Sequence, residues 1–218
     1  MIALFDLDGT LTDPREGILG SARYALERLG VPAPSDEMLA SFIGPPLRGM
    51  FAALLAGSGP HAVEEAVRLY RERYREIGIF QTRMYEGVPE MLEGTARIAE
   101  ALFLVTSKPW MFAERILEHL GLAEHFRRVY GPELDGRFDD KGELLAHLLA
   151  SERVAADRCV MIGDRSADVT AALANGARPV GVLWGYGSVE ELTTAGATSL
   201  CSTPADLPPL LAELKARY

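Results

Sequence analysis

The chain has 218 residues, of which 48% are hydrophobic and 24% are charged, and these proportions are typical of a globular protein. This length is enough for one large domain or for one domain that carries an insertion. The formal net charge of -9 argues against nucleic acid or an anionic membrane as the main partner. An anionic substrate would need a metal ion or a few placed basic residues.

The cysteine content and the apolar runs indicate a cytoplasmic protein. Cys159 and Cys201 lack the spacing of a metal site and do not suggest a disulfide framework, so a reducing compartment fits. No apolar stretch approaches the roughly 18 residues of a transmembrane helix. A strand-like run begins at residue 2, so we expect no signal peptide before it. The sequence leaves monomer and homodimer open.

Short apolar runs alternate with helical patterns along most of the chain. This alternation predicts an α/β fold, a Rossmann-like parallel sheet flanked by helices. The predicted strands cover residues 2–5, 101–105, 127–130, 159–162 and 180–183, and the predicted helices cover residues 88–99, 110–120, 141–149, 166–174 and 205–215.

The stretch from about residue 14 to residue 84 contains no convincing buried strand. Gly30 is a natural stop for its first helix, and Ser35 can cap its second, which should end at Gly44. We therefore assign residues 1–13 and 85–218 to a catalytic core and residues 14–84 to an inserted all-helical cap. The helical patterns of the cap cover residues 18–29, 35–44, 47–55 and 62–77.

Aspartates follow the first strand. Asp6 and Asp8 are two residues apart, so their side chains should emerge together at the carboxyl edge of the sheet, where open α/β sheets place their sites. Gly9 permits a tight turn and a close approach of the backbone to a ligand. Two aspartates and a glycine can also simply form a turn.

A second pair of aspartates follows the strand at 159–162. If Ser166 begins a helix, Asp164 and Asp168 face the same side near its start. Asp168 alone would equally suit a helix N-terminus. Together with Asp6 and Asp8, however, the pair would crowd four carboxylates at one sheet edge, which is unfavourable without a cation. Oxygen ligands, and the absence of histidine from these particular runs, favour Mg²⁺ over zinc.

Two further features suit a phosphoryl group. The hydroxyl and backbone N–H groups of Thr106-Ser107-Lys108, which end the strand at 101–105, could hold phosphate oxygens, although Thr and Ser are also ordinary helix caps. Lys141 opposes the helix dipole at the start of its helix. Contact with the carboxylates or with a phosphate would explain this lysine, and a solvated side chain is the alternative.

These residues resemble, in order and position, the four signatures of the haloacid dehalogenase superfamily. The first is Asp6-Leu7-Asp8-Gly9-Thr10, and the last is Gly163-Asp164-Arg165-Ser166-Ala167-Asp168. Thr106 and Lys141 stand for the second and third. The insertion resembles the superfamily's helical cap of the first type. Gly44-Pro45-Pro46-Leu47, Thr106-Ser107-Lys108-Pro109 and Trp184-Gly185-Tyr186-Gly187 look most like the phosphoglycolate phosphatase branch.

The resemblance implies a phosphatase that acts on a small phosphorylated molecule through an aspartyl-phosphate. Asp6 would be the nucleophile and Asp8 the general acid/base. Thr106 and Lys141 would hold the transferring group, which Gly9, Thr10, Ser107 and Lys108 would also contact. Mg²⁺ would bind Asp6, the backbone carbonyl of Asp8 and Asp164, with Asp168 binding directly or through water. The presence of Asp8 is significant because dehalogenase members lack an aspartate at this position.

The cap would exclude water and select the leaving group. We expect Arg48, just after a tight loop, to bind a substrate anion, although a helix-surface arginine is an equal alternative. Phosphoglycolate, a 5′-nucleotide, a sugar phosphate and pyrophosphate all remain open as substrates. Two other classes also compete: a phosphosugar mutase of the β-phosphoglucomutase type, and a non-catalytic receiver-like regulator that is phosphorylated on an aspartate.

Overall fold

The computed structural model describes residues 1–216, which divide into two compact units. The core unit contains Met1–Asp13 and the chain from Met84 onward, and the helical unit contains Pro14–Arg83. The chain leaves the core unit after β2 (Thr12–Asp13) and returns to it through β3 (Arg83–Met84). Within these described residues, no helix is both long enough and apolar enough to cross a membrane.

The core unit contains the predicted parallel sheet, whose strand order is β5-β4-β1-β6-β7-β8. In the ladders that join these strands, Phe5 lies beside Leu104 and Ile162, so β1, β4 and β6 end at nearly the same level. Residues that follow these three strands therefore emerge at one edge. The strands are β1 (Ile2–Phe5), β4 (Leu102–Val105), β5 (Arg128–Tyr130), β6 (Cys159–Gly163), β7 (Arg178–Val182) and β8 (Leu200–Cys201).

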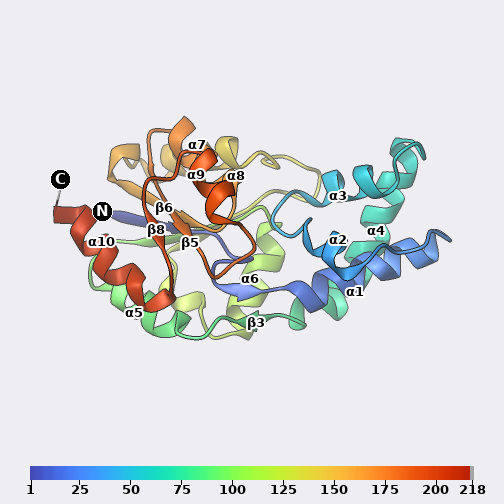
Figure 1. Cartoon of the computed structure of the whole chain (residues 1–218), viewed down its shortest axis with the longest axis horizontal. Coiled ribbons are helices and arrows are strands. Elements are labelled where there is room, and N and C mark those ends of the chain that lie inside the picture. Colours follow the sequence, from blue (N-terminus) through green and yellow to red (C-terminus); the bar gives the residue numbers. More distant parts are fainter. Residues whose placement is uncertain (217–218) are drawn as a thin grey trace. The chain divides into compact units, whose positions relative to one another are not determined.

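Helices flank both faces of this sheet (Figure 1). On one face, Leu144 and Leu148 of α7 join Leu4 and Phe103 of the sheet in a buried cluster, because apolar residues at helical spacing share one side of the helix. On the other face, α5 and α10 pack against each other. The helices are α5 (Val88–Ala96), α6 (Trp110–His119), α7 (Lys141–Glu152), α8 (Ser166–Ala174), α9 (Val189–Thr194) and α10 (Leu207–Ala216). Short 3₁₀ turns cover Gly78–Phe80, Ala123–His125, Ala156–Arg158 and Pro204–Asp206.

The fold class predicted from the sequence is confirmed, with differences at short elements. Strand β8 and helix α9 were not predicted, because two and six residues are too short to show a period. Helix α7 continues to Glu152, beyond the predicted end at residue 149, and stops where Arg153 adopts a left-handed conformation with φ 55°.

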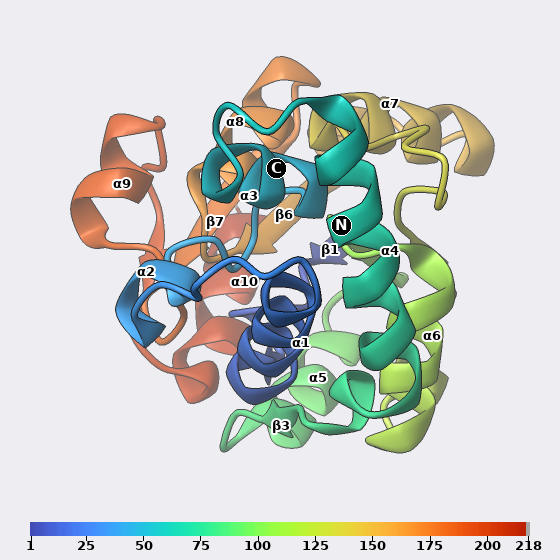
Figure 2. The ribbon, with the colours of Figure 1, turned by 90° about the vertical axis from the view of Figure 1, so that its right-hand side faces the viewer.

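The helical unit contains four α-helices, as its periodicity predicts. Gly30, with φ 70°, follows the first helix, and the Ser35 hydroxyl caps the second by accepting from the Met38 amide at 3.3 Å. That second helix ends at Ala40, before the predicted stop at Gly44. Helices α1 and α4 lie side by side (Figure 2). The four are α1 (Arg15–Arg28), α2 (Asp36–Ala40), α3 (Leu47–Leu54) and α4 (Pro60–Glu76).

Candidate active site

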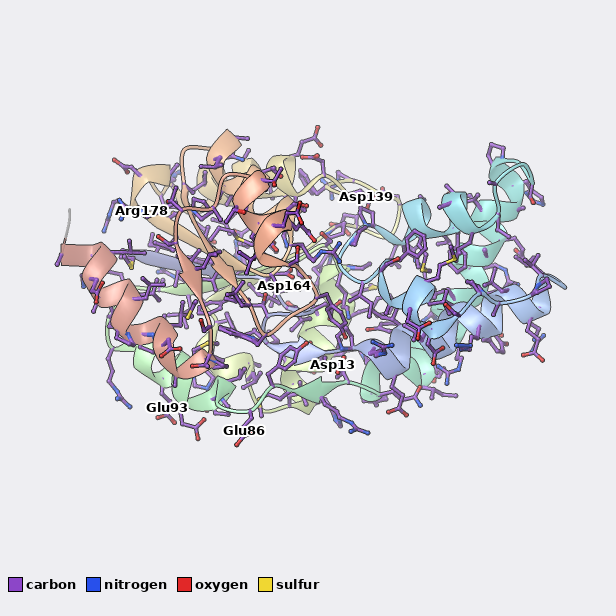
Figure 3. All side chains as sticks on the ribbon, in the orientation of Figure 1. Asp13, Glu86, Glu93, Asp139, Asp164 and Arg178 are labelled. Atoms are coloured by element: carbon purple, nitrogen blue, oxygen red, sulfur yellow. The ribbon has the colours of Figure 1, made fainter. Side chains whose placement is uncertain are left out.

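Three aspartates meet at the carboxyl edge of the sheet. Asp6 follows β1, Asp164 follows β6, and Asp168 lies in the first turn of α8, and one oxygen from each lies within 4.8 Å of the others. All three side chains are buried, and Figure 3 labels Asp164 among them. Like charges this close repel one another unless a cation is present. A set of carboxylate oxygens without histidine fits a hard divalent cation, so these residues suit a divalent metal site.

Lys141 supplies a fixed positive charge beside this cluster. Its Nζ lies 2.8 Å from Asp6 Oδ1, and it also donates to Asp168 Oδ1. Burial alone would lower the pKa of Lys141, but Asp168 and Asp6 raise it above its usual value. The lysine therefore stays charged, which explains why a cation stands at the first position of α7 against the helix dipole.

Asp164 is held by two donors from different parts of the core unit. Its Oδ1 accepts from the Thr10 hydroxyl at 3.4 Å, and its Oδ2 accepts from the Tyr186 amide at 2.8 Å. Burial, followed by the charges of Asp6 and Asp168, raises its pKa to about 8. Gly9 passes so close that a Cβ there would lie 2.2 Å from Asp164 Oδ2, and its φ of 90° also favours glycine.

Asp168 combines a structural and an electrostatic contact. Its Oδ2 accepts a hydrogen bond from the Arg165 amide at 3.0 Å, and this contact caps α8. Its Oδ1 accepts a hydrogen bond from Lys141 Nζ. Burial raises its pKa, and Lys141 opposes that effect. The helix-terminus role and the cluster role, which are alternatives in the sequence, are thus both present in the structure.

Asp8 forms a second buried ion pair. Lys108 Nζ lies 2.8 Å from Asp8 Oδ1 and 2.7 Å from its Oδ2. Burial raises the pKa of Asp8, although the nearby Lys108 charge lowers it. A carboxyl group whose pKa is raised can hold a proton closer to neutral pH, as a general acid must.

The residues after β4 lie at the same edge. Thr106 is buried, and its Oγ1 accepts from the Lys108 amide at 3.2 Å, while Ser107 is half-buried. Arg48 belongs to the helical unit, where its Nε donates to Glu64 Oε1 at 2.9 Å. The core unit therefore brings together every predicted site residue except Arg48.

Trp184 and Tyr186 also lie at the site, although the sequence alone did not predict this. Trp184 Nε1 donates to the Thr10 carbonyl at 2.9 Å, and the Tyr186 amide binds Asp164. The signal available was the run Trp184-Gly185-Tyr186-Gly187 directly after a strand of the same sheet. A residue that donates to a buried carboxylate leaves no pattern of its own, so the run indicated only a resemblance to the phosphoglycolate phosphatase branch.

Comparison with known proteins identifies the family of this chain. Residues 3–182 match the model of the family described as haloacid dehalogenase-like hydrolase. A 5′-nucleotidase of Pseudomonas aeruginosa is 46% identical over 204 residues, covering 94% of this chain and 92% of that protein. A tyrosine-protein kinase PtkA of Mycobacterium tuberculosis is 37% identical over 90% of this chain and 67% of that protein. A phosphoglycolate phosphatase of Xanthomonas campestris is 33% identical over 84% of this chain and 83% of that protein.

Comparison with solved structures gives the same family. A predicted phosphatase from Clostridium acetobutylicum has a crystal structure that superposes with a TM-score of 0.92 at 35% identity, covering 97% of this chain and 98% of that one. The chain belongs to the haloacid dehalogenase-like hydrolase family. Within this family it is an enzyme of the phosphatase type, with a buried aspartate cluster suited to a divalent metal.

Proposed function

We propose that the protein is a Mg²⁺-dependent phosphatase that hydrolyses small-molecule phosphomonoesters through an aspartyl-phosphate on Asp6. The observation that carries this proposal is the buried cluster of Asp6, Asp164 and Asp168 with Lys141 among them. Burying this many charged groups lowers the stability of the fold, so a functional reason for the cluster is expected. Phosphoryl transfer needs such a concentration of charge at one point.

Asp6 and Asp8 divide the chemistry between them. The Asp6 carboxylate attacks phosphorus and forms an acyl-phosphate, while the bond to the leaving oxygen breaks. Asp8, whose pKa is raised by burial, gives its proton to that oxygen. Asp8 then takes a proton from the water that attacks phosphorus, which releases inorganic phosphate and restores Asp6.

The remaining residues hold the transferring group. Lys141 Nζ, which contacts Asp6 at 2.8 Å, offsets the negative charge that develops on the phosphoryl oxygens. The hydroxyl and amide groups of Thr106 and Ser107, and the backbone around Gly9 and Thr10, serve as donors. Mg²⁺ held by Asp6, the Asp8 carbonyl, Asp164 and Asp168 would neutralise carboxylate charge and polarise the phosphoryl group.

We assign the choice of leaving group to the helical unit. Its Arg48 is paired with Glu64 at 2.9 Å, and the Arg48 side chain is 29% exposed. A guanidinium can exchange such a surface partner for a substrate anion, because exposed ion pairs are weak. The helical unit then acts as a cap that contributes a cation to substrate recognition.

The named relatives decide which substrates are tested first. A 5′-nucleotide leads because of the similar nucleotidase, and phosphoglycolate follows. Sugar phosphates and pyrophosphate complete the panel. Phosphate release and substrate loss are measured together with and without Mg²⁺.

We expect phosphate to appear in proportion to substrate loss, and only with the metal. Isomerisation without phosphate release would instead show a mutase, and stable phosphorylation without turnover of any ester would show a regulator. Transfer to a tyrosine peptide in place of water would show a kinase-like acceptor preference, as the name of one relative suggests.

A further inference from the structure

The loop that follows β7, residues 183–188, contacts the aspartate cluster through hydrogen bonds. The Tyr186 amide donates to Asp164 Oδ2 at 2.8 Å. The Trp184 indole donates to the carbonyl of Thr10 at 2.9 Å, and Thr10 in turn donates its hydroxyl to Asp164 Oδ1. The loop thus holds Asp164 directly from one side and through Thr10 from the other.

The glycines of this loop bring its backbone against the same residues. A Cβ added at Gly185 would lie 2.2 Å from the Gly9 carbonyl oxygen and 2.5 Å from Asp164 Cβ. A Cβ added at Gly187 would lie 1.7 Å from the Asp164 carbonyl oxygen. Since real side chains do not pack at such distances, both positions require glycine for close approach.

A further contact ties the loop to the end of β2. The Tyr186 hydroxyl donates to Asp13 Oδ1, so Tyr186 binds Asp164 through its backbone amide and Asp13 through its side-chain hydroxyl. The loop therefore links the segment after β1 to the segment after β6. These are the segments that carry Asp6, Asp8 and Asp164.

We propose that residues 183–188 are a positioning element for the metal ligand Asp164 and for the turn that carries Asp8. This inference rests on the proposed function, because it assumes that a divalent cation binds at the cluster. Each carboxylate oxygen has two lone pairs. A fixed donor on one lone pair of each Asp164 oxygen orients the carboxylate and leaves the remaining lone pairs for the cation.

Direct metal binding tests this proposal without relying on turnover. Mn²⁺ replaces Mg²⁺ as the probe, and its electron paramagnetic resonance signal measures binding to the substrate-free protein. Gly185→Ala pushes the loop away from Gly9 and Asp164. Trp184→Phe removes only the indole donor and retains an aromatic ring.

A matched control is available in α5. A Cβ at Gly94 would lie 2.8 Å from Pro208 Cγ, so Gly94→Ala also introduces a methyl group into a tight contact. Its neighbour Glu93 lies well away from Asp164 in Figure 3. The melting temperature of each variant is measured beside its Mn²⁺ dissociation constant.

We expect Gly185→Ala to weaken Mn²⁺ binding by about tenfold or more, and Trp184→Phe to weaken it by a smaller factor, as is common when a donor to a metal ligand is lost. The control should lose thermal stability and keep the wild-type dissociation constant. For Trp184→Phe, kcat should return toward the wild-type value at saturating Mg²⁺. A purely structural defect would not be rescued by metal.

The proposal is overturned if Trp184→Phe and any folded Gly185→Ala protein bind Mn²⁺ within about twofold of the wild type, a change too small for a lost ligand-positioning contact. If Gly185→Ala does not fold, Trp184→Phe decides. Failure of the wild type itself to bind Mn²⁺ would contradict the metal site of the proposed function. The variants therefore test the role of the loop, and the wild type tests the metal site.

Discussion

At the scale of single residues, the buried pair of Asp8 and Lys108 raises the question of which role Lys108 has: binding phosphate or positioning the general acid. Lys108 contacts both oxygens of Asp8, at 2.8 and 2.7 Å. A lysine that only binds phosphate should affect all esters alike. A lysine that positions the general acid should matter most for esters whose leaving group needs a proton.

Lys108→Met should therefore lower kcat/KM for both an alkyl and an aryl phosphate, but the loss for the alkyl phosphate should be about tenfold larger. Only the alkyl leaving group depends strongly on protonation by the general acid. Asp8→Asn should show the same preference more strongly. Lys215→Met, which removes a lysine that donates to the Ile98 carbonyl, is the control. Equal losses on both esters would assign Lys108 to phosphate binding alone.

The raised pKa of Asp164 makes a prediction about pH. Its folded pKa of about 8 lies above the unfolded value of 3.8. Between these two pH values, Asp164 is therefore protonated in the folded metal-free protein and deprotonated in the unfolded chain. The resulting stability is present below the unfolded pKa and is lost as pH rises toward about 8. Mg²⁺ needs the deprotonated carboxylate, so its binding should strengthen over the same range.

Thermal unfolding should accordingly show a larger increase in melting temperature on adding Mg²⁺ at about pH 8.5 than at about pH 5.5. Asp164→Asn should flatten the pH dependence of the metal-free protein and abolish the response to Mg²⁺. A Mg²⁺ response that is equal at both pH values would show that proton release from the cluster is not linked to metal binding.

At the scale of elements, the long periodic segments were predictable and the short ones were not. Helix α8 has the predicted bounds, because Ser166 and the apolar residues after it mark its start and period. Helix α9 and strand β8 have too few residues to show one. Likewise, the contacts of Trp184 and Tyr186 arise from tertiary packing, which a local pattern does not encode.

The helical unit carries a prediction through its α3–α4 ion pair. If Arg48 binds the substrate anion, Arg48→Ala should raise KM for an anionic substrate severalfold, by about the energy of one exposed charge contact, and leave kcat largely intact. Glu64→Gln weakens the same ion pair but retains the guanidinium, so it should leave KM near the wild-type value. Unchanged catalytic efficiency of Arg48→Ala on every cleaved substrate would exclude the role.

At the scale of the whole molecule, the order of the strands explains why distant signatures form one site. β1 lies between β4 and β6, so residues after each of these strands meet, although Thr10 and Asp164 are 154 positions apart in the chain. The sequence was sufficient to predict this meeting, because parallel strands share a carboxyl edge. It did not reveal the Lys108 pairing with Asp8, because either Lys108 or Lys141 could have faced either aspartate.

The central claim is that Asp6 makes the bond to phosphorus, and the most direct measurement is the turnover of an aryl phosphate with Mg²⁺ by Asp6→Asn. The variant keeps the size of the side chain, so its melting temperature should show that it is folded. We predict that turnover falls by about 10³-fold or more, as when a covalent nucleophile is removed. A folded Asp6→Asn protein with near-wild-type turnover would contradict the account.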